Sequence, residues 1–240
     1  NKSIKIKDSI YWIFITLFNT KCISPCLGNN KFNKLHKKID YLPFCLNINN
    51  YSKVWFLNNK INILTVGKFV SRKNHLLLIR ALSKIKTKYD FQLTIIGECT
   101  TQEHLNYLKK IKKQINVNNY DIKILTNIKS KDVSNMYKKN DLFVLPSVNE
   151  PASVSNLEAM AYGLPVITTD TNNTSCYTED EINGYIVKSN DIESLAKKIE
   201  YLIENKDLLI KFGNKSINLV KEKYNPDVNY KKYFKHVLNY

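Results

Sequence analysis

The sequence has few of the features that mark disulfide-rich or zinc-binding proteins. Five cysteines occur in 240 residues, at positions 22, 26, 45, 99 and 176. An odd number at irregular spacing argues against a disulfide framework. Cys22 and Cys26 stand close together, but no matching Cys or His pair follows them, so no zinc site is predicted. We therefore expect a reducing compartment, no metal and no other cofactor.

Long apolar runs and long low-complexity tracts are also missing. The longest apolar run, Ile10–Phe18, is too short to span a bilayer, and no small-residue cleavage site follows it. We interpret it as a buried helix or strand, with a membrane-surface element as the alternative. Apolar residues make up 43% of the chain, which allows a packed core. Because the chain begins with Asn1 rather than Met, we expect a fragment or a processed piece.

Acidic residues are outnumbered by basic ones. The chain has 37 Lys and Arg against 21 Asp and Glu, a net charge of +16. We favour a Lys- and Asn-rich composition in which most lysines are solvated. The alternative is attraction to an anionic partner, such as a membrane face, a nucleic acid or a phosphorylated substrate. The charges are spread rather than blocked and no nucleic-acid-binding motif is present, so nucleic acid is not an expected partner.

From residue 61 onward, short apolar runs alternate with helical patterns. Strands are predicted over residues 61–67, 91–97, 121–126, 141–147, 164–169 and 185–188. Helices are predicted between them, and three more close the chain at 192–204, 206–223 and 228–238. We expect Thr100 with Glu103 to form a capping box, and Ser130 to cap the next helix. This alternation predicts an α/β fold with a doubly wound, Rossmann-like parallel sheet that binds its ligand at the carboxyl ends of the strands.

Residues 1–60 do not continue this pattern. We interpret them as an apolar helix, a short strand near Cys22, a small helix over residues 31–38 and a linker over residues 40–44. This is too little for a second domain, and it indicates the end of one.

Two lysines follow the end of the first regular strand. Gly67 ends that strand, and Lys68 and Lys73 stand five positions apart at the start of a helix. Both can face the crevice at the edge of the sheet, where the compact charge of lysine suits phosphate oxygens. Solvated surface lysines are the alternative, because so many positions of this chain are basic.

The segment EPASVSNLEAMAYGL, residues 150–164, carries two glutamates eight positions apart, Glu150 and Glu158. Small and hydroxyl residues lie between them, and a helix begins there. The free N–H groups and the dipole of a helix N-terminus suit a phosphate, and carboxylates can hold sugar hydroxyls. The segment therefore predicts a nucleotide-sugar site. The alternatives are a capping box of Ser155 with Glu158 and a solvated loop carboxylate at Glu150.

Taken together, three segments resemble a known family: VGKFVSRKN (66–74), DLFVLPSVNEPASVSNLEAMAYGLPVITTD (141–170) and NGYIV (183–187). They look like the carboxyl-terminal half of retaining glycosyltransferases with two Rossmann-like domains, the GT-B type of glycosyltransferase family four. The likeness runs from about Asp40 to the end. It implies a remnant of the amino-terminal acceptor domain with the linker (1–45), a donor-binding domain (46–225) and a carboxyl-terminal helix that returns toward the amino-terminal domain (226–240).

The resemblance also implies roles for individual residues. Lys68, where the family usually has Arg, and Lys73 would bind the donor diphosphate. Glu150 would hold hydroxyls of the donor sugar, and Glu158 would hold the ribose. Backbone N–H groups near the start of the following helix would meet phosphate or sugar. The expected catalytic residues are therefore Glu150, Lys68 and Lys73, and the expected donor-binding residues are Gly67, Ser153, Val154 and Glu158.

Two departures from the family pattern make the sugar harder to name. EPAS replaces the commoner glycine-containing turn, and residues 171–180 lack the glycine pair and the nearby Glu often found there. We assign none of the four histidines a catalytic role, and we expect His75 to face solvent at the start of a helix.

The resemblance implies an enzyme of the hexosyltransferase type. It would transfer a sugar from a nucleotide sugar to a glycan or lipid-linked acceptor, with retention and without a metal, in surface polysaccharide synthesis. A cytoplasmic location is expected, peripheral to an anionic inner membrane face. Since the acceptor half is missing, the chain alone is expected to be inactive. The alternatives are a sugar-phosphate synthase or epimerase on the same scaffold, a non-catalytic nucleotide-sugar-binding module and a basic nucleic-acid-binding protein.

Overall fold

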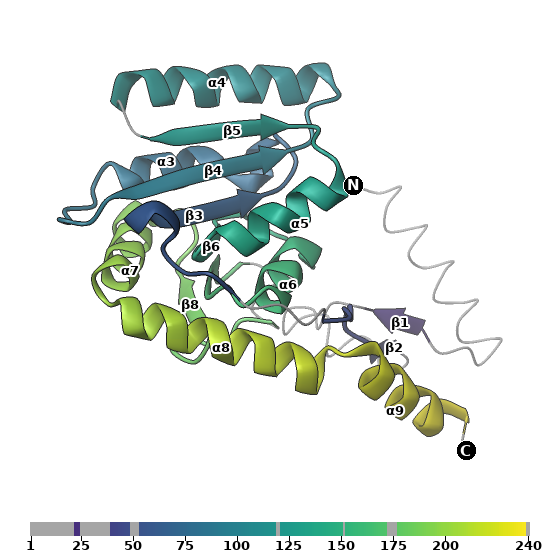
Figure 1. Ribbon diagram of the computed structural model, residues 1–240. Helices are drawn as coiled ribbons and strands as arrows, with labels where there is room; N and C mark the ends of the chain where they lie inside the picture. The colour runs from purple at the N-terminus through teal and green to yellow at the C-terminus, as the bar shows by residue number, and fades with distance from the viewer. Residues whose placement is uncertain are drawn as a thin grey trace.

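The computed structural model describes residues 22–24, 39–48, 53–118, 121–150, 152–171 and 177–238. In these residues the chain forms a six-stranded sheet and a separate two-stranded one (Figure 1). The apolar run Ile10–Phe18 and the helix predicted over residues 31–38 lie outside the described residues.

All six strands of the larger sheet are parallel, and they run in the order β5-β4-β3-β6-β7-β8. They are β3 (Ile61–Val66), β4 (Phe91–Gly97), β5 (Ile122–Thr126), β6 (Leu142–Leu145), β7 (Val166–Thr169) and β8 (Gly184–Val187). The chain builds outward from β3 to one edge, returns to β6 and builds toward the other. The predicted doubly wound α/β fold is thereby confirmed. Its switch point lies between β3 and β6, where a sheet of this kind opens a crevice at the carboxyl ends of its strands.

Helices cover both faces of this sheet (Figure 1). One core includes side chains of α3 (His75–Leu82), α4 (Gln102–Asn118) and α7 (Ile192–Glu204). The other includes side chains of α5 (Ser130–Lys139), α6 (Val154–Ala161) and α8 (Lys206–Lys223). Neighbours along β3 alternate between the cores: Ile63 belongs to the first and Leu64 to the second. This is the two-residue period of a strand that is buried on both faces.

Several helix ends differ from the predicted ones. The Thr101 hydroxyl, not that of Thr100, accepts the bond from His104 N, at 3.2 Å. The Thr100 hydroxyl instead donates to Glu98, 2.8 Å away. Ser130 is the first residue of α5 rather than its cap, and the preceding Lys129 makes no side-chain capping bond. The predicted bounds of α7 and α8 agree with the structure.

The last helix, α9 (Pro226–Leu238), begins at Pro226, earlier than predicted. The first position of a helix tolerates proline because its N–H would have no helical partner. No helix in the described part of the chain is long and apolar enough to cross a membrane.

The segment before the larger sheet contains one predicted strand and one that the sequence did not indicate. The strand near Cys22 is confirmed as β1 (Cys22–Ser24), which pairs in parallel with β2 (Ile39–Tyr41). The linker predicted over residues 40–44 was therefore wrong at its start, because residues 40 and 41 belong to β2. Residues 42–48 form no regular structure, and Leu46 N donates to Tyr224 O at 2.9 Å.

Asp141 fastens the entering chain to the larger sheet. Its buried carboxylate accepts backbone bonds from Phe56 N and Asn62 N, both at 2.8 Å. Phe56 precedes a short 3-10 helix, η1 (Leu57–Asn59), that leads into β3. Lys53 Nζ donates to Asn140 O at 2.5 Å, and burial lowers the pKa of Lys53 to about 8. These contacts fix where the chain enters the fold.

Four loops at the carboxyl edge of the sheet contain an asparagine with a left-handed backbone. Asn74, Asn127, Asn149 and Asn190 all have left-handed backbones, with φ of 54°, 53°, 53° and 61°. Asparagine tolerates this conformation better than other residues with a side chain, because its short polar group can bond locally.

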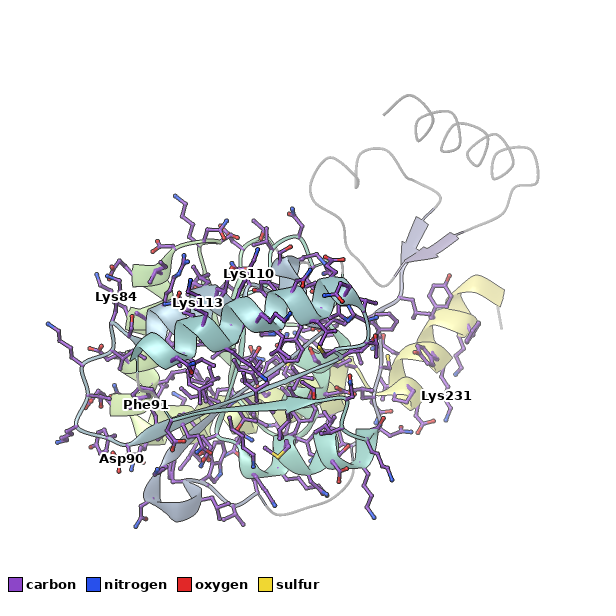
Figure 2. All side chains as sticks on the ribbon, turned by 90° about the horizontal axis from the view of Figure 1, so that it is seen from above. Lys84, Asp90, Phe91, Lys110, Lys113 and Lys231 are labelled. Atoms are coloured by element: carbon purple, nitrogen blue, oxygen red, sulfur yellow. The ribbon has the colours of Figure 1, made fainter. Side chains whose placement is uncertain are left out.

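Lysine side chains are spread over the molecule. Figure 2 labels Lys84 beyond α3, Lys110 and Lys113 on α4, and Lys231 on α9, in separate places on the structure.

Candidate functional site

A buried ion pair lies at the switch point of the sheet. Oε2 of Glu150 is 2.7 Å from Lys73 Nζ and 2.6 Å from Arg72 Nη1. The side chains of Glu150 and Lys73 are only 6% and 10% exposed, whereas Arg72 is 44% exposed. Burial alone would raise the pKa of Glu150, but Lys73 and Arg72 outweigh it and hold that pKa below its usual value. Glu150 is therefore not the solvated loop carboxylate of the alternative interpretation.

The backbone is shaped to let Lys73 reach this place. Lys73 ends a short 3-10 helix, η2 (Ser71–Lys73), that follows β3. A Cβ at Gly67 would lie 2.9 Å from both Cδ and Cε of Lys73, so the aliphatic part of Lys73 passes directly over Gly67. Val148 N donates to Arg72 O at 2.8 Å and ties the loop after β6 to η2. The two loops that carry the ion pair are thus joined by their backbones.

Lys68 does not join this pair. Its Nζ lies 3.0 Å from Oε2 of Glu98, and the two side chains are 60% and 43% exposed. The bond from Thr100 and the contact with Lys68 lower the pKa of Glu98. Of the two lysines predicted to act together, the structure places only Lys73 against Glu150. Arg72, to which the sequence analysis gave no role, takes the second position.

The N-terminus of α6 follows the ion pair in sequence. Ser153 is buried and is the N-cap, since its Oγ accepts a bond from Asn156 N at 3.2 Å. Val154 is the first helical residue, and its side chain is exposed. The N–H groups in the first turn of a helix have no hydrogen-bond acceptor within the helix, so this turn can bind an anion. The capping box of Ser155 with Glu158 was wrong, because Ser155 lies inside the helix and Ser153 caps it.

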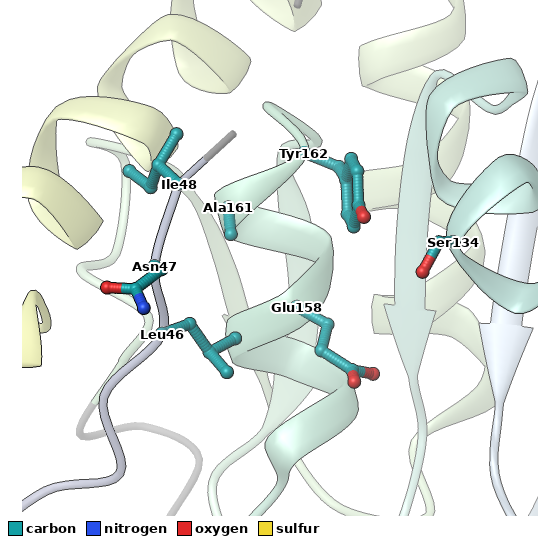
Figure 3. Close-up of a pocket in the computed structure, with 7 residues that line it drawn as sticks. All are labelled: Leu46, Asn47, Ile48, Ser134, Glu158, Ala161 and Tyr162. Carbon is teal, nitrogen blue, oxygen red and sulfur yellow. The ribbon is translucent and has the colours of Figure 1, made fainter. Parts of the chain in front are cut away.

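Glu158 lies one turn further along α6 and faces α5. Its Oε2 accepts a bond of 2.9 Å from the hydroxyl of Tyr137. Burial raises the pKa of Glu158, and the bond from Tyr137 lowers it in part. Glu158 lines a pocket of about 130 Å³, shown in Figure 3, whose other lining residues are Leu46, Asn47, Ile48, Ser134, Ala161 and Tyr162. The sequence pattern did not predict that Tyr137 and residues 46–48 lie beside Glu158.

His75 was predicted to face solvent, and this was wrong. It is 1% exposed, with its ring centre 5.5 Å from that of Phe69 and 6.0 Å from that of Tyr107. Burial, together with the charge of Lys73, lowers the pKa of His75 to about 3. Its Nδ1 has no hydrogen-bond partner in the described part of the chain. His75 is therefore a neutral core residue next to the ion pair.

The described residues contain no group of three or more His, Cys, Asp or Glu side chains that could hold a metal ion. Lys73, Arg72, Glu150, the first turn of α6 and Glu158 thus supply cations, N–H donors and carboxylate acceptors at one edge of the sheet. Such an arrangement can hold a ligand that carries both phosphate and hydroxyl groups.

Comparison with known proteins gives consistent results. The family model described as "Glycosyl transferases group 1" matches residues 47–219. An uncharacterized glycosyltransferase of Haemophilus influenzae is 31% identical over 177 residues, which are 72% of this chain and 47% of that protein. The capsular polysaccharide biosynthesis glycosyltransferase CapM of Staphylococcus aureus is 28% identical over 173 residues, 72% of this chain and 44% of that protein. The chain thus spans about half the length of the curated relatives it matches.

The fold is also that of a solved structure with a bound nucleotide. The crystal structure of Anabaena HepE in complex with UDP and glucose superposes with a TM-score of 0.79, at 16% identity, over 92% of this chain and 64% of that one. At this identity the likeness concerns the fold.

Proposed function

The chain belongs to the group 1 glycosyltransferases, and we propose that it holds the donor-binding part of a retaining enzyme that transfers a sugar from a nucleotide sugar. The observation that carries this proposal is the buried pair of Lys73 and Glu150 at the switch point of the sheet, 2.7 Å apart. A cation and a carboxylate held out of water at a ligand edge suit a substrate with adjacent phosphate and sugar groups.

The cations would act on the leaving group. As the bond from the sugar to the diphosphate breaks, negative charge develops on the phosphate oxygens. Lys73 and Arg72, with the N–H groups of Ser153 and Val154 at the start of α6, would stabilise that charge. Lys68 would contribute only by exchanging its contact with Glu98 for one with phosphate, so its role is secondary in this proposal.

The carboxylates would hold the hydroxyls of the donor. When the donor binds, its phosphates would replace some of the contacts that Lys73 and Arg72 make with Glu150 in the free chain. The Glu150 carboxylate would then be able to accept hydrogen bonds from the donor sugar. Glu158 would accept bonds from the ribose at the pocket beside α5. Gly67 would act indirectly, because its missing side chain leaves room for Lys73.

The remaining half of the enzyme would bind the acceptor, a glycan or a lipid-linked sugar. We propose that residues 1–45 end that domain and form the linker, that residues 46–225 bind the donor, and that residues 226–240 return toward the acceptor domain. The chain alone would then bind donor without efficient transfer. The name of CapM supports a role in surface polysaccharide synthesis. We propose action in the cytoplasm at the anionic inner face of the membrane, which suits the net charge of +16.

Calorimetric titration of the chain with UDP tests the donor site. Exchange of Lys68 and Lys73 for alanine should weaken binding by at least about tenfold, since a bond to a charged group contributes about 1.5–3 kcal/mol. The matched control is the exchange of Lys110 and Lys113 on α4, which removes the same charge from an exposed helix face. Equal losses in the two double variants would indicate unspecific attraction of a polyanion. Unchanged affinity in the Lys68 and Lys73 variant would contradict the proposed site.

A further inference from the structure

Tyr137 on α5 contacts two residues at the end of α6, Glu158 and Tyr162. The Tyr137 side chain is almost fully buried, and its hydroxyl donates to Oε2 of Glu158 at 2.9 Å, with the carbonyl oxygen of Ser155 as a longer second acceptor at 3.3 Å. Its ring is stacked on that of Tyr162, with centres 5.5 Å apart and an angle of 7° between the planes. The ring of Phe143 on β6 lies 6.0 Å away on a tilted plane. The ring is therefore fixed by packing, and the position of its hydroxyl is fixed with it.

The hydroxyl limits how Glu158 can be placed. Glu158 is half-buried at the wall of the pocket in Figure 3, and its flexible chain could otherwise take several rotamers. A carboxylate accepts bonds at two oxygens. When Tyr137 uses Oε2, Oε1 remains to accept a bond from a ligand, and the plane of the carboxylate is already set.

We infer that Tyr137 is a positioning residue for donor binding: its buried hydroxyl fixes the Glu158 carboxylate so that a ligand diol meets it in one orientation. This inference rests on the proposed function, in which Glu158 holds the ribose. A tyrosine used only to fill the core could be replaced by phenylalanine without a change in the pKa of Glu158 or in ligand affinity. A positioning tyrosine loses the bond to Glu158.

The Tyr137 hydroxyl also affects the ionisation of Glu158. Burial raises the pKa of Glu158, and the bond from Tyr137 lowers it. The other titratable group on the pocket wall is Tyr162, with Lys138 Nζ 6.0 Å from its ring centre. Ser134 and the 46–48 segment, which complete the wall, carry no charge. Without the hydroxyl, the effect of burial on the pKa of Glu158 is no longer offset by the bond from Tyr137, so this pKa should rise.

The test uses Tyr137→Phe, which keeps the stacked ring. The side-chain carboxyl signal of Glu158 is followed against pH in carbon-13-labelled protein, with Glu158→Gln to assign it. Binding of UDP is measured on the same proteins. Tyr185→Phe is the matched control, since Tyr185 is also buried but belongs to the core on the other face of the sheet. We expect a higher pKa of Glu158 in Tyr137→Phe, no change in Tyr185→Phe, and a loss of UDP affinity of about 3–10-fold in Tyr137→Phe only.

A double-mutant cycle separates positioning from general damage to the fold. Once Glu158→Gln is in place, Tyr137→Phe should have little further effect on UDP affinity, because the bond is already altered. Additive losses would overturn the inference, as would an unchanged pKa of Glu158 or an unchanged UDP affinity in Tyr137→Phe. If the unaltered chain does not bind UDP, the same measurements are made with GDP and ADP, and failure with all three would instead contradict the proposed function, and the inference with it.

Discussion

The ammonium of Lys73 lies 2.7 Å from Oε2 of Glu150, the same oxygen that the guanidinium of Arg72 approaches. Two cations on one buried oxygen leave an excess of positive charge beside it, and Arg72 is the more exposed of the two. A buried ion pair adds little net stability, because taking both charges out of water is costly. Net stability alone therefore gives little reason to bury these charges together, and under the proposed function both cations would meet the donor phosphates.

Lys73 should matter far more to stability than Lys68. Lys73→Met removes the buried cation from the buried Glu150 carboxylate and leaves the more exposed Arg72 beside it, and loss of a buried partner costs about 3 kcal/mol. Lys68→Met removes only an exposed contact and should leave stability unchanged. Urea unfolding of the two variants measures the difference. Adding Glu150→Gln to Lys73→Met should recover part of the loss, and equal destabilisation by the two lysine variants would contradict the burial of the pair.

Gly67→Ala should mainly weaken ligand binding, whereas Gly97→Ala should mainly destabilise the fold. A Cβ at Gly67 meets the flexible end of Lys73, which can move, so we expect a loss of stability below about 1 kcal/mol but weaker binding of UDP. A Cβ at Gly97 meets the backbone oxygen of Gly67 at 2.4 Å, which cannot move easily, so the loss of stability should be about 2 kcal/mol or more. Unfolding curves and calorimetry on both variants test this. Unchanged UDP affinity in Gly67→Ala would contradict the role of Gly67.

The cap of α6 can be tested with two neighbouring serines. Ser153→Ala removes the hydroxyl that accepts from Asn156 N and should cost about 1 kcal/mol. Ser155→Ala removes the hydroxyl 2.9 Å from Ser153 Oγ but leaves the cap itself, and it should cost less than about 0.5 kcal/mol, since alanine is the better helix former. The midpoints of urea unfolding distinguish the two. A larger effect at Ser155 would favour the capping box that the sequence suggested.

His75 should make the protein sensitive to mild acid. Its pKa is about 3 in the folded chain because burial disfavours the charged ring, whereas the unfolded chain takes up a proton near pH 6.5. Between these values the unfolded state binds more protons, so stability falls as pH falls, by up to about 1.4 kcal/mol per pH unit from this residue.

His75→Phe keeps an aromatic ring between Phe69 and Tyr107 and removes the titration. The decrease in unfolding free energy between pH 6.5 and 5 should therefore be smaller in the variant than in the unaltered chain. In this interval the Glu150 carboxylate, whose pKa is lowered, stays ionised in the folded state. Parallel pH profiles would show that His75 does not carry the effect.

The sequence predicted the sheet better than the contacts at its edge. Runs such as Ile61–Val66 and Phe91–Gly97 are short and mostly apolar, as expected of strands that are buried on both faces of a sheet. The pattern could not separate Lys68 from Lys73, since both follow the same strand. What separates them is the path of η2, which carries Lys73 back over Gly67 and leaves Lys68 beside Glu98.

Other misses have the same origin. The bond from Tyr137 to Glu158 joins α5 to α6 across 21 residues of sequence, and no local spacing indicates it. Thr100 and Thr101 are equally good caps by residue type, and only the backbone geometry chooses Thr101. His75 follows a polar segment, yet its helix turns it into the core. Each case depends on a contact between residues distant in sequence or on a local turn that several residue types allow.

The asparagine turns have a consequence for the thermodynamics of binding. Glycine at a left-handed position samples many conformations, whereas asparagine with the same φ samples fewer. The loops at Asn74, Asn127, Asn149 and Asn190 are thus stiffer than glycine loops would be. Stiff loops have less conformational entropy to lose when a ligand orders them. The edge of the sheet at which the donor is proposed to bind is therefore preorganised by side chains that need not touch the donor.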